Sequence, residues 1–216
     1  MTKLTVVNVF RELAKLYKPP RSFLDWKTPL DLTVATILSA QCTDVRTNIV
    51  TKGLFRRCRT AKDYVQMPRE ELEELVRSCG TFRMKAKHIQ ELCILLLERH
   101  GGKVPQTMEE LVALPGIGKK TAAIILYAAF NKNAGVAVDT HVQRLARRLG
   151  FTKEKSPDKI ALDIEKQIPR RQWGRLNTLL ISHGRAVCTA RNRQCERCVF
   201  GYSCPSSQVL NRRDLA

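Results

Sequence analysis

Apolar residues recur three and four positions apart along most of the chain, which is the spacing of one face of an α-helix. In residues 6–18 the apolar positions are 6, 9, 10, 13, 14 and 17, and Pro19-Pro20 end the pattern. Helix start signals, each a capping residue with proline or an acidic residue close behind it, occur at Thr28, Thr60, Thr107 and Ser156. No stretch shows the sustained alternation that strands require. The pattern predicts an all-α chain.

The predicted helices follow from these start signals and from the glycines and prolines that end each pattern. They are residues 6–18, 29–38, 44–58, a short helix after 60, 70–79, 85–100, a short helix after 107, a long helix after 118, 140–149, a helix from 157, and 172–183.

Residues 114–130, LPGIGKKTAAIILYAAF, combine a short turn with a helix that is almost wholly apolar after two lysines. A short helix should run into Pro115, reverse at Gly116-Ile117-Gly118 and leave as a second helix, which is a helix-hairpin-helix. Gly116 and Gly118 lack Cβ atoms, so their N–H groups can approach an anionic oxygen, and the helix N-terminus adds its positive dipole. We predict that this turn binds a backbone phosphate. The alternative is a corner in which the glycines only permit the bend.

Two lysines occupy the polar end of this apolar helix. Lys120 lies in the first turn, ahead of a stretch that must be buried, beside Lys119 and at a dipole end that disfavours a cation. Each of these conditions is expected to lower the pKa of an amine. An ordinary lysine is almost fully protonated at pH 7, and only the neutral amine is a nucleophile. A lowered pKa would therefore make an amine at this position more nucleophilic. We predict that Lys120 is a nucleophile.

The composition indicates a polyanionic partner. The 216 residues carry a formal net charge of +18, and 44% hydrophobic content is enough for one large core or two smaller ones. Residues 24–134 hold 17 Lys and Arg against 12 Asp and Glu, whereas the two ends of the chain together hold 21 against 8. No apolar run reaches spanning length and no signal peptide is visible, which favours nucleic acid over membrane and a cytoplasmic location with the nucleoid. A generally basic protein is the alternative.

The eight cysteines fall into two groups. Four are scattered through helical patterns as small hydrophobes, namely Cys42, Cys58, Cys79 and Cys93. The other four lie within 17 residues in the pattern C-x6-C-x2-C-x5-C, namely Cys188, Cys195, Cys198 and Cys204. With no sign of secretion, this spacing favours a metal site over a disulfide framework. Four thiolates suit zinc or an iron–sulfur cluster alike.

The order of motifs, ILSAQCTD, LPGIGKKTA, VDTHVQRLARRLG and then the four cysteines, resembles the endonuclease III family of helix-hairpin-helix DNA glycosylases over nearly the whole chain. The resemblance implies a six-helix barrel domain at 24–134 and a second helical domain made of 1–23 and 135–216. In that second domain the four clustered cysteines would hold a [4Fe-4S] cluster. A monomer would bind double-stranded DNA that carries a damaged pyrimidine or an abasic site, and the DNA would lie across the cleft between the domains.

The resemblance also implies roles for single residues. Family members remove oxidised pyrimidines and then cut the strand at the abasic site. On the matching positions, Lys120 would attack the sugar C1′ and form a Schiff base that undergoes β-elimination, and Asp139 would activate the amine or stabilise the developing positive charge. Asp139 also directly precedes a helix, where an N-cap role alone would account for it.

Gln41 matches the family residue that occupies the space left by a flipped nucleotide, although an exposed polar loop is an alternative interpretation. The apolar wedge that family members often carry would fall on Thr81, next to Phe82, and this departure leaves the wedge unassigned.

Arg191 and Arg193 lie between two of the clustered cysteines. A loop held at both ends by metal bonds orders its arginines at low entropic cost, which predicts phosphate binding. The alternative is a zinc knuckle with a solvated basic loop. The leading hypothesis for the chain is a bifunctional glycosylase and abasic-site lyase. Lys120 disfavours a monofunctional mismatch glycosylase, and Lys120 together with Asp139 disfavours a non-catalytic DNA-binding or redox-sensing module.

Overall fold

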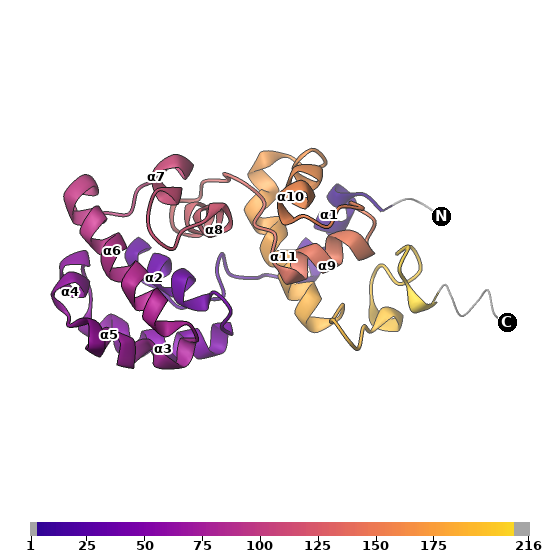
Figure 1. Ribbon diagram of the computed structural model, residues 1–216. Helices are drawn as coiled ribbons and strands as arrows, with labels where there is room; N and C mark the ends of the chain where they lie inside the picture. The colour runs from indigo at the N-terminus through magenta and orange to yellow at the C-terminus, as the bar shows by residue number, and fades with distance from the viewer. Residues whose placement is uncertain (1–3, 210–216) are drawn as a thin grey trace. The chain divides into compact units, whose positions relative to one another are not determined.

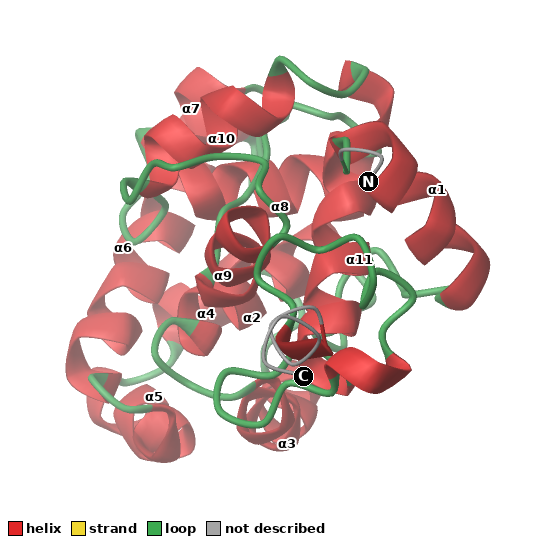
Figure 2. Ribbon diagram, turned by 90° about the vertical axis from the view of Figure 1, so that its right-hand side faces the viewer, coloured by secondary structure: helices red, strands yellow, loops and turns green. Residues whose placement is uncertain are grey.

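The computed structural model describes residues 4–209, and within that range it contains helices and loops but no strand (Figure 1, Figure 2). The prediction of an all-α chain is confirmed. Two compact units make up the chain: the hairpin unit, Ser22–Lys132, and the cysteine unit, Met1–Arg21 with Asn133–Ala216. No helix among the described residues combines the length and the apolar character needed to cross a membrane.

The hairpin unit is built around one helix that is buried on nearly every side. Its helices are α2 (Pro29–Ser39), α3 (Asp44–Arg57), α4 (Ala61–Gln66), α5 (Arg69–Val76), the 3₁₀ turn η1 (Arg77–Cys79), α6 (Phe82–His100), α7 (Met108–Val112) and α8 (Lys119–Phe130). Leu32, Val34 and Leu38 of α2 are fully buried, and α2 packs against α3, α6 and α8. A helix that is apolar all round belongs at the centre of a core. The core therefore fixes α8 and the turn that precedes it.

Threonine caps start several of these helices where the sequence predicts them. The Thr28 hydroxyl accepts the Asp31 N–H at 3.1 Å while the Asp31 carboxylate accepts the Thr28 N–H at 2.9 Å, which completes a capping box. Thr60 and Asp63 form a second box, and Thr107 caps α7. These local contacts explain why the sequence signals succeed.

The start of α6 differs from its prediction. The helix begins at Phe82, three residues before the predicted start at Lys85. Its N-cap, Thr81, has a left-handed backbone with φ 42° and makes no side-chain capping bond. A start without a capping side chain leaves no local signal in the sequence.

The cysteine unit joins both ends of the chain in one core. Its helices are α1 (Val6–Leu16), α9 (Thr140–Arg148), α10 (Pro157–Glu165) and α11 (Trp173–Ala186), with 3₁₀ turns η2 (Arg170–Gln172) and η3 (Cys195–Arg197). α11 packs against α1 and α9, and Leu13, Leu145 and Leu180 meet in the core. Phe200 connects the cysteine-rich segment to that core.

Candidate nucleic-acid interface and cysteine cluster

The turn between α7 and α8 exposes backbone N–H groups. Gly116 has a left-handed backbone with φ 77°, and a Cβ there would lie 3.1 Å from the Cβ of His88. Gly118 is the N-cap of α8 with φ −94°, and a Cβ there would meet nothing within 4 Å. The first N–H groups of α8 have no partner within the helix, and no side chain of residues 4–209 caps them. The turn is open to an anion from outside the chain.

Lys119 and Lys120 are the first two residues of α8, and both side chains are exposed. Neither takes part in a hydrogen bond or ion pair within residues 4–209. The helix becomes buried from Ala122 onward, which fixes the backbone of Lys120 while its ammonium stays in solvent. The Lys120 side chain is therefore exposed, although the helix that carries it is buried from Ala122 onward. A bound ligand would have to exclude water from this amine.

Asp139 is the N-cap of α9 and is half-buried. Its Oδ1 accepts the Val142 N–H at 2.8 Å, while Oδ2 has no hydrogen-bond partner in the part of the chain that the structure describes. The preceding segment is anchored, because buried Asn177 donates to the Ala137 carbonyl at 2.5 Å. Capping thus uses one carboxylate oxygen and leaves the other available.

Gln41 follows the C-terminus of α2 and is exposed, with a left-handed backbone at φ 54°. Thr81 is exposed in the same conformation at φ 42°. Non-glycine residues rarely adopt this region, and where they do the surroundings must impose it. Nothing in the sequence marks either residue for this conformation.

The four clustered cysteines line one small cavity in the cysteine unit, together with His183 and Leu145. Burial raises the pKa of Cys198 to about 11 and also raises the pKa of Cys204, and the neighbouring thiols add to both shifts. In their present positions, no three His, Cys, Asp or Glu side chains of residues 4–209 could hold a metal ion. The donor set around the cavity is nevertheless rich in sulfur, which fits a thiolate-bound metal group.

Two side chains and one backbone amide direct polar atoms at these sulfurs. His183 Nε2 lies 3.4 Å from Cys198 Sγ, and the Phe200 N–H donates to the same sulfur at 3.4 Å. Arg148 Nη1 donates to Cys188 Sγ at 3.3 Å. Such contacts stabilise negative charge on sulfur ligands. Sequence reasoning missed His183 and Arg148; the only available signals were a histidine within an apolar helix and an arginine pair on α9.

Arg191 and Arg193 lie on the cysteine loop as predicted, but their surroundings differ. Arg191 is exposed. Arg193 is partly buried, and its Nη1 donates to the Ser206 carbonyl at 2.8 Å. Arg193 is therefore anchored to the protein, while Arg191 is held only by its place in the loop.

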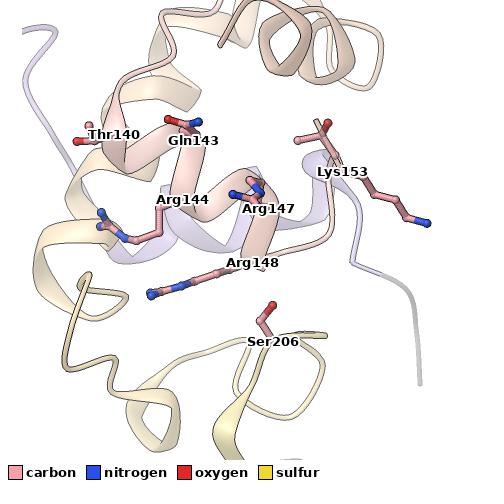
Figure 3. Close-up of a pocket in the computed structure, with 8 residues that line it drawn as sticks. Thr140, Gln143, Arg144, Arg147, Arg148, Lys153 and Ser206 are labelled. Carbon is pink, nitrogen blue, oxygen red and sulfur yellow. The ribbon is translucent and has the colours of Figure 1, made fainter. Parts of the chain in front are cut away.

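A groove of about 700 Å³ runs beside α9 (Figure 3) and was not predicted from the sequence. It is lined by Thr140, Gln143, Arg144, Arg147, Arg148, Thr152, Lys153 and Ser206. Four of these residues are cationic and none is acidic. Arg144 and Arg148 donate to the Cys188 and Thr189 carbonyls and are thereby fixed, whereas Arg147 and Lys153 are exposed. The groove offers positive charge, and no acidic side chain lines it within residues 4–209.

The chain is similar to known proteins over nearly its whole length. Residues 34–170 match the model of the HhH-GPD superfamily base excision DNA repair protein. Endonuclease III of Synechocystis sp. is 50% identical over 207 residues, which are 96% of this chain and 94% of the relative. A solved non-covalent endonuclease III–DNA complex has a TM-score of 0.91 at 39% identity and covers 98% of this chain and 99% of its own. A trapped endonuclease III–DNA covalent intermediate, an estranged-adenine complex, has a TM-score of 0.90 at 37% identity, with 100% of both chains covered.

Proposed function

Because this chain belongs to the endonuclease III family within the HhH-GPD superfamily, we propose that it excises oxidised pyrimidines from double-stranded DNA and cleaves the strand at the abasic site. It is a base-excision DNA glycosylase and abasic-site lyase that acts as a single chain on duplex DNA. Such a substrate implies that the protein works in the nucleoid.

One observation carries the proposal: an exposed, unpaired amine follows directly on a turn with free backbone N–H groups. The open N-terminus of α8 and the Gly116–Gly118 turn would bind a backbone phosphate, and Lys119 would add positive charge. The sugar next to that phosphate is then held near the first turn of α8, where Lys120 lies. A structural corner would need neither the free N–H groups nor the amine.

Lys120 supplies the nucleophile of the proposed reaction. Its neutral amine attacks the sugar C1′, the bond from C1′ to the base breaks, and the base leaves with the bonding electrons and takes up a proton. Opening of the sugar ring gives a Schiff base between Lys120 and C1′. Loss of a proton from C2′ then breaks the bond to the 3′ oxygen, which cleaves the strand by β-elimination. Bound DNA would exclude water from the exposed amine.

Asp139 assists this reaction with the carboxylate oxygen that capping does not use. Its Oδ1 is held by the Val142 N–H, which fixes the orientation of the group. Oδ2 then accepts the amine proton or stabilises positive charge on the sugar.

Gln41 is proposed to fill the space that the flipped nucleotide leaves in the duplex. It projects into solvent from the end of α2, a helix fixed by the core of the hairpin unit. A polar side chain on a rigid support can replace hydrogen bonds of the missing nucleotide.

The basic surface of the cysteine unit is proposed to bind DNA phosphates without reading sequence. Arg191 and Arg193 on the cysteine loop, and the cations of the groove beside α9, supply this charge. Arginine side chains that are already ordered lose little entropy when they meet a phosphate.

The cysteine cluster is proposed to hold a [4Fe-4S] cluster through Cys188, Cys195, Cys198 and Cys204. All four line one cavity, and contacts from His183 and Arg148 suit sulfur atoms that carry negative charge. When bound, the cluster ties the C-terminal segment to the core. It takes no part in the steps at C1′.

The proposed function is tested by measuring base release and strand cleavage on matched duplexes. Each duplex carries one abasic site, oxidised pyrimidine, oxidised purine or mismatch. We expect base release with strand cleavage at the oxidised pyrimidine and cleavage at the abasic site. Base release from a mismatch without cleavage would indicate a monofunctional glycosylase. Binding without base release or cleavage would indicate a binding module.

A further inference from the structure

One buried lysine of the hairpin unit donates hydrogen bonds to backbone carbonyls alone in the described part of the chain. Lys85 is 4% exposed, and its Nζ donates to the carbonyls of Leu38 at 2.8 Å, Ala40 at 2.6 Å and Cys79 at 2.5 Å. No acidic side chain forms an ion pair with it within residues 4–209. Lysines are almost never buried without partners, so three convergent carbonyls must offset the cost of desolvation.

These carbonyls belong to the ends of two helices. Leu38 and Ala40 lie at the C-terminus of α2, and Cys79 is the last residue of η1. Carbonyls at a helix C-terminus lack partners within the helix and carry the negative end of its dipole. The Lys85 ammonium therefore completes both helix ends and joins them to α6.

A left-handed turn begins just beyond each helix end. Gln41 directly follows Ala40, and Thr81 lies two residues after Cys79, with φ angles of 54° and 42°. For a residue with a side chain this conformation is unfavourable, and it persists only where the surroundings impose it. The bonds from Lys85 to the carbonyls before the two turns provide that constraint.

The thiols of Cys79 and Cys42, the residue after Gln41, interact electrostatically next to Lys85. Burial raises the pKa of Cys79 to about 11, and Cys42 adds to the shift. Burial lowers the pKa of Lys85, whereas the adjacent Cys79 and Cys42 thiols act in the opposite direction. Gln41 and Thr81 thus project from one connected structure.

We propose that Lys85 is a positioning residue that ties the Gln41 turn to the Thr81 turn and so holds Gln41 in the arrangement needed to open a DNA duplex. This inference rests on the proposed role of Gln41. A side chain that replaces a flipped nucleotide must already be held in position when the base stack opens. If its turn were disordered, ordering it during binding would cost conformational entropy. Lys85 touches no reacting atom, so its contribution concerns duplex opening and not the chemistry at C1′.

The test compares two substrates of the same sequence, an abasic site in a duplex and the same site in a single strand. Single-stranded DNA has no opposite base and no paired stack to open. In Lys85→Met, which keeps the length of the side chain but donates no hydrogen bond, we expect the ratio of duplex to single-strand cleavage rates to fall by about 10- to 100-fold. The single-strand rate should stay close to wild type. An equal loss on both substrates would overturn the proposal.

Gln90→Met provides the matched control. Gln90 lies on the same helix, is 7% exposed, and donates to the Tyr64 carbonyl at 3.1 Å and the Met67 carbonyl at 2.7 Å. The Tyr64 and Met67 carbonyls lie next to neither the Gln41 turn nor the Thr81 turn. The variant should lose thermal stability yet keep the wild-type rate ratio. If Gln90→Met lowers the ratio as much as Lys85→Met, the effect is general destabilisation and the proposal fails.

Gln41→Ala separates this inference from the proposed function. We expect it to lower the same ratio, and the variant that combines it with Lys85→Met should lose little more than either alone. If Gln41→Ala lowers the ratio while Lys85→Met leaves it unchanged, the inference fails and the role of Gln41 stands. If neither lowers it, both fail. Should Lys85→Met not fold, Lys85→Leu, which also donates no hydrogen bond, is read by the same criteria.

Discussion

The two glycines of the hairpin turn have different roles, one in stability and the other in the proposed binding of phosphate. Gly116 needs glycine for the fold, because its φ is 77° and a Cβ would crowd His88 at 3.1 Å. Gly118 has an ordinary φ of −94° and open space where a Cβ would lie. If the turn binds a phosphate, that open space is where the phosphate approaches.

Alanine at Gly116 should therefore lower stability, whereas alanine at Gly118 should weaken DNA binding. Gly116→Ala should lower the free energy of unfolding by about 1–2 kcal/mol, the cost of a left-handed backbone. Gly118→Ala should leave stability within about 0.5 kcal/mol but weaken DNA binding, because its methyl group meets the phosphate. Urea unfolding and a binding titration measure the pair. Wild-type DNA affinity in Gly118→Ala would remove this turn from the interface.

The variant Asp139→Asn removes the carboxylate charge but keeps a side chain that can cap α9. Asparagine caps helices as well as aspartate, so stability should stay within about 0.5 kcal/mol of wild type. The rate of strand cleavage should fall on the order of 10² or more, because the carboxylate charge is lost. Single-turnover cleavage with saturating enzyme measures this rate. A variant that cleaves at the wild-type rate would reduce Asp139 to a helix cap.

Among the elements, the cysteine loop combines an anchored arginine with an exposed one. Arg193 donates a hydrogen bond to the Ser206 carbonyl, while Arg191 is exposed and donates none to residues 4–209. Guanidinium groups attract phosphate whatever the DNA sequence.

Alanine at both arginines should make the dependence of log Kd on log salt shallower by about 2, one unit for each lost phosphate contact. Binding should weaken equally on different sequences. Alanine at Lys155 and Lys166, exposed cations of the same unit outside the loop and the groove, serves as the control and should leave the slope nearly unchanged. An unchanged slope in the arginine variant would exclude the loop from the DNA interface.

The success of sequence reasoning varies with the range of the interactions involved. Thr28 and Thr60 form their caps within four residues, so local pattern predicts α2 and α4. Thr81 starts α6 without a capping bond, so pattern places the start at Lys85 instead. Lys85 itself binds carbonyls up to 47 residues away, and only the tertiary structure brings them together.

The same holds for the candidate site. The turn before Lys120 is local and could be predicted from its glycines, but the exposure of Lys120 depends on the packing of α8. The groove beside α9 collects residues from α9, from the segment after it and from Ser206, so no contiguous motif marks it.

In the whole molecule, one unit contains both ends of the chain and most of the net positive charge. α1 and α11 share a core, and Phe200 attaches the cysteine loop to it. The loop itself has only short 3₁₀ structure, so bonds to a metal group would provide much of its order.

Purified protein should be brown and contain about four irons per chain. Cys198→Ser should lose iron and yield poorly folded protein, because removal of one thiolate releases the loop from the core. Metal analysis and circular dichroism measure both effects. Cys58→Ser, a change at a buried cysteine of the other unit, should keep its iron. Zinc in a colourless, active preparation would contradict the account.

The central claim is that Lys120 forms a covalent bond to DNA, and borohydride trapping on a duplex with an abasic site measures that bond most directly. Wild-type protein should be trapped, since borohydride reduces a Schiff base to a stable amine. Lys120→Ala should bind DNA but give no trapped complex, because the turn that holds phosphate is unchanged. Lys119→Ala removes the adjacent, equally exposed lysine and should still be trapped. Trapping of Lys120→Ala at the wild-type rate would show that another amine is the nucleophile.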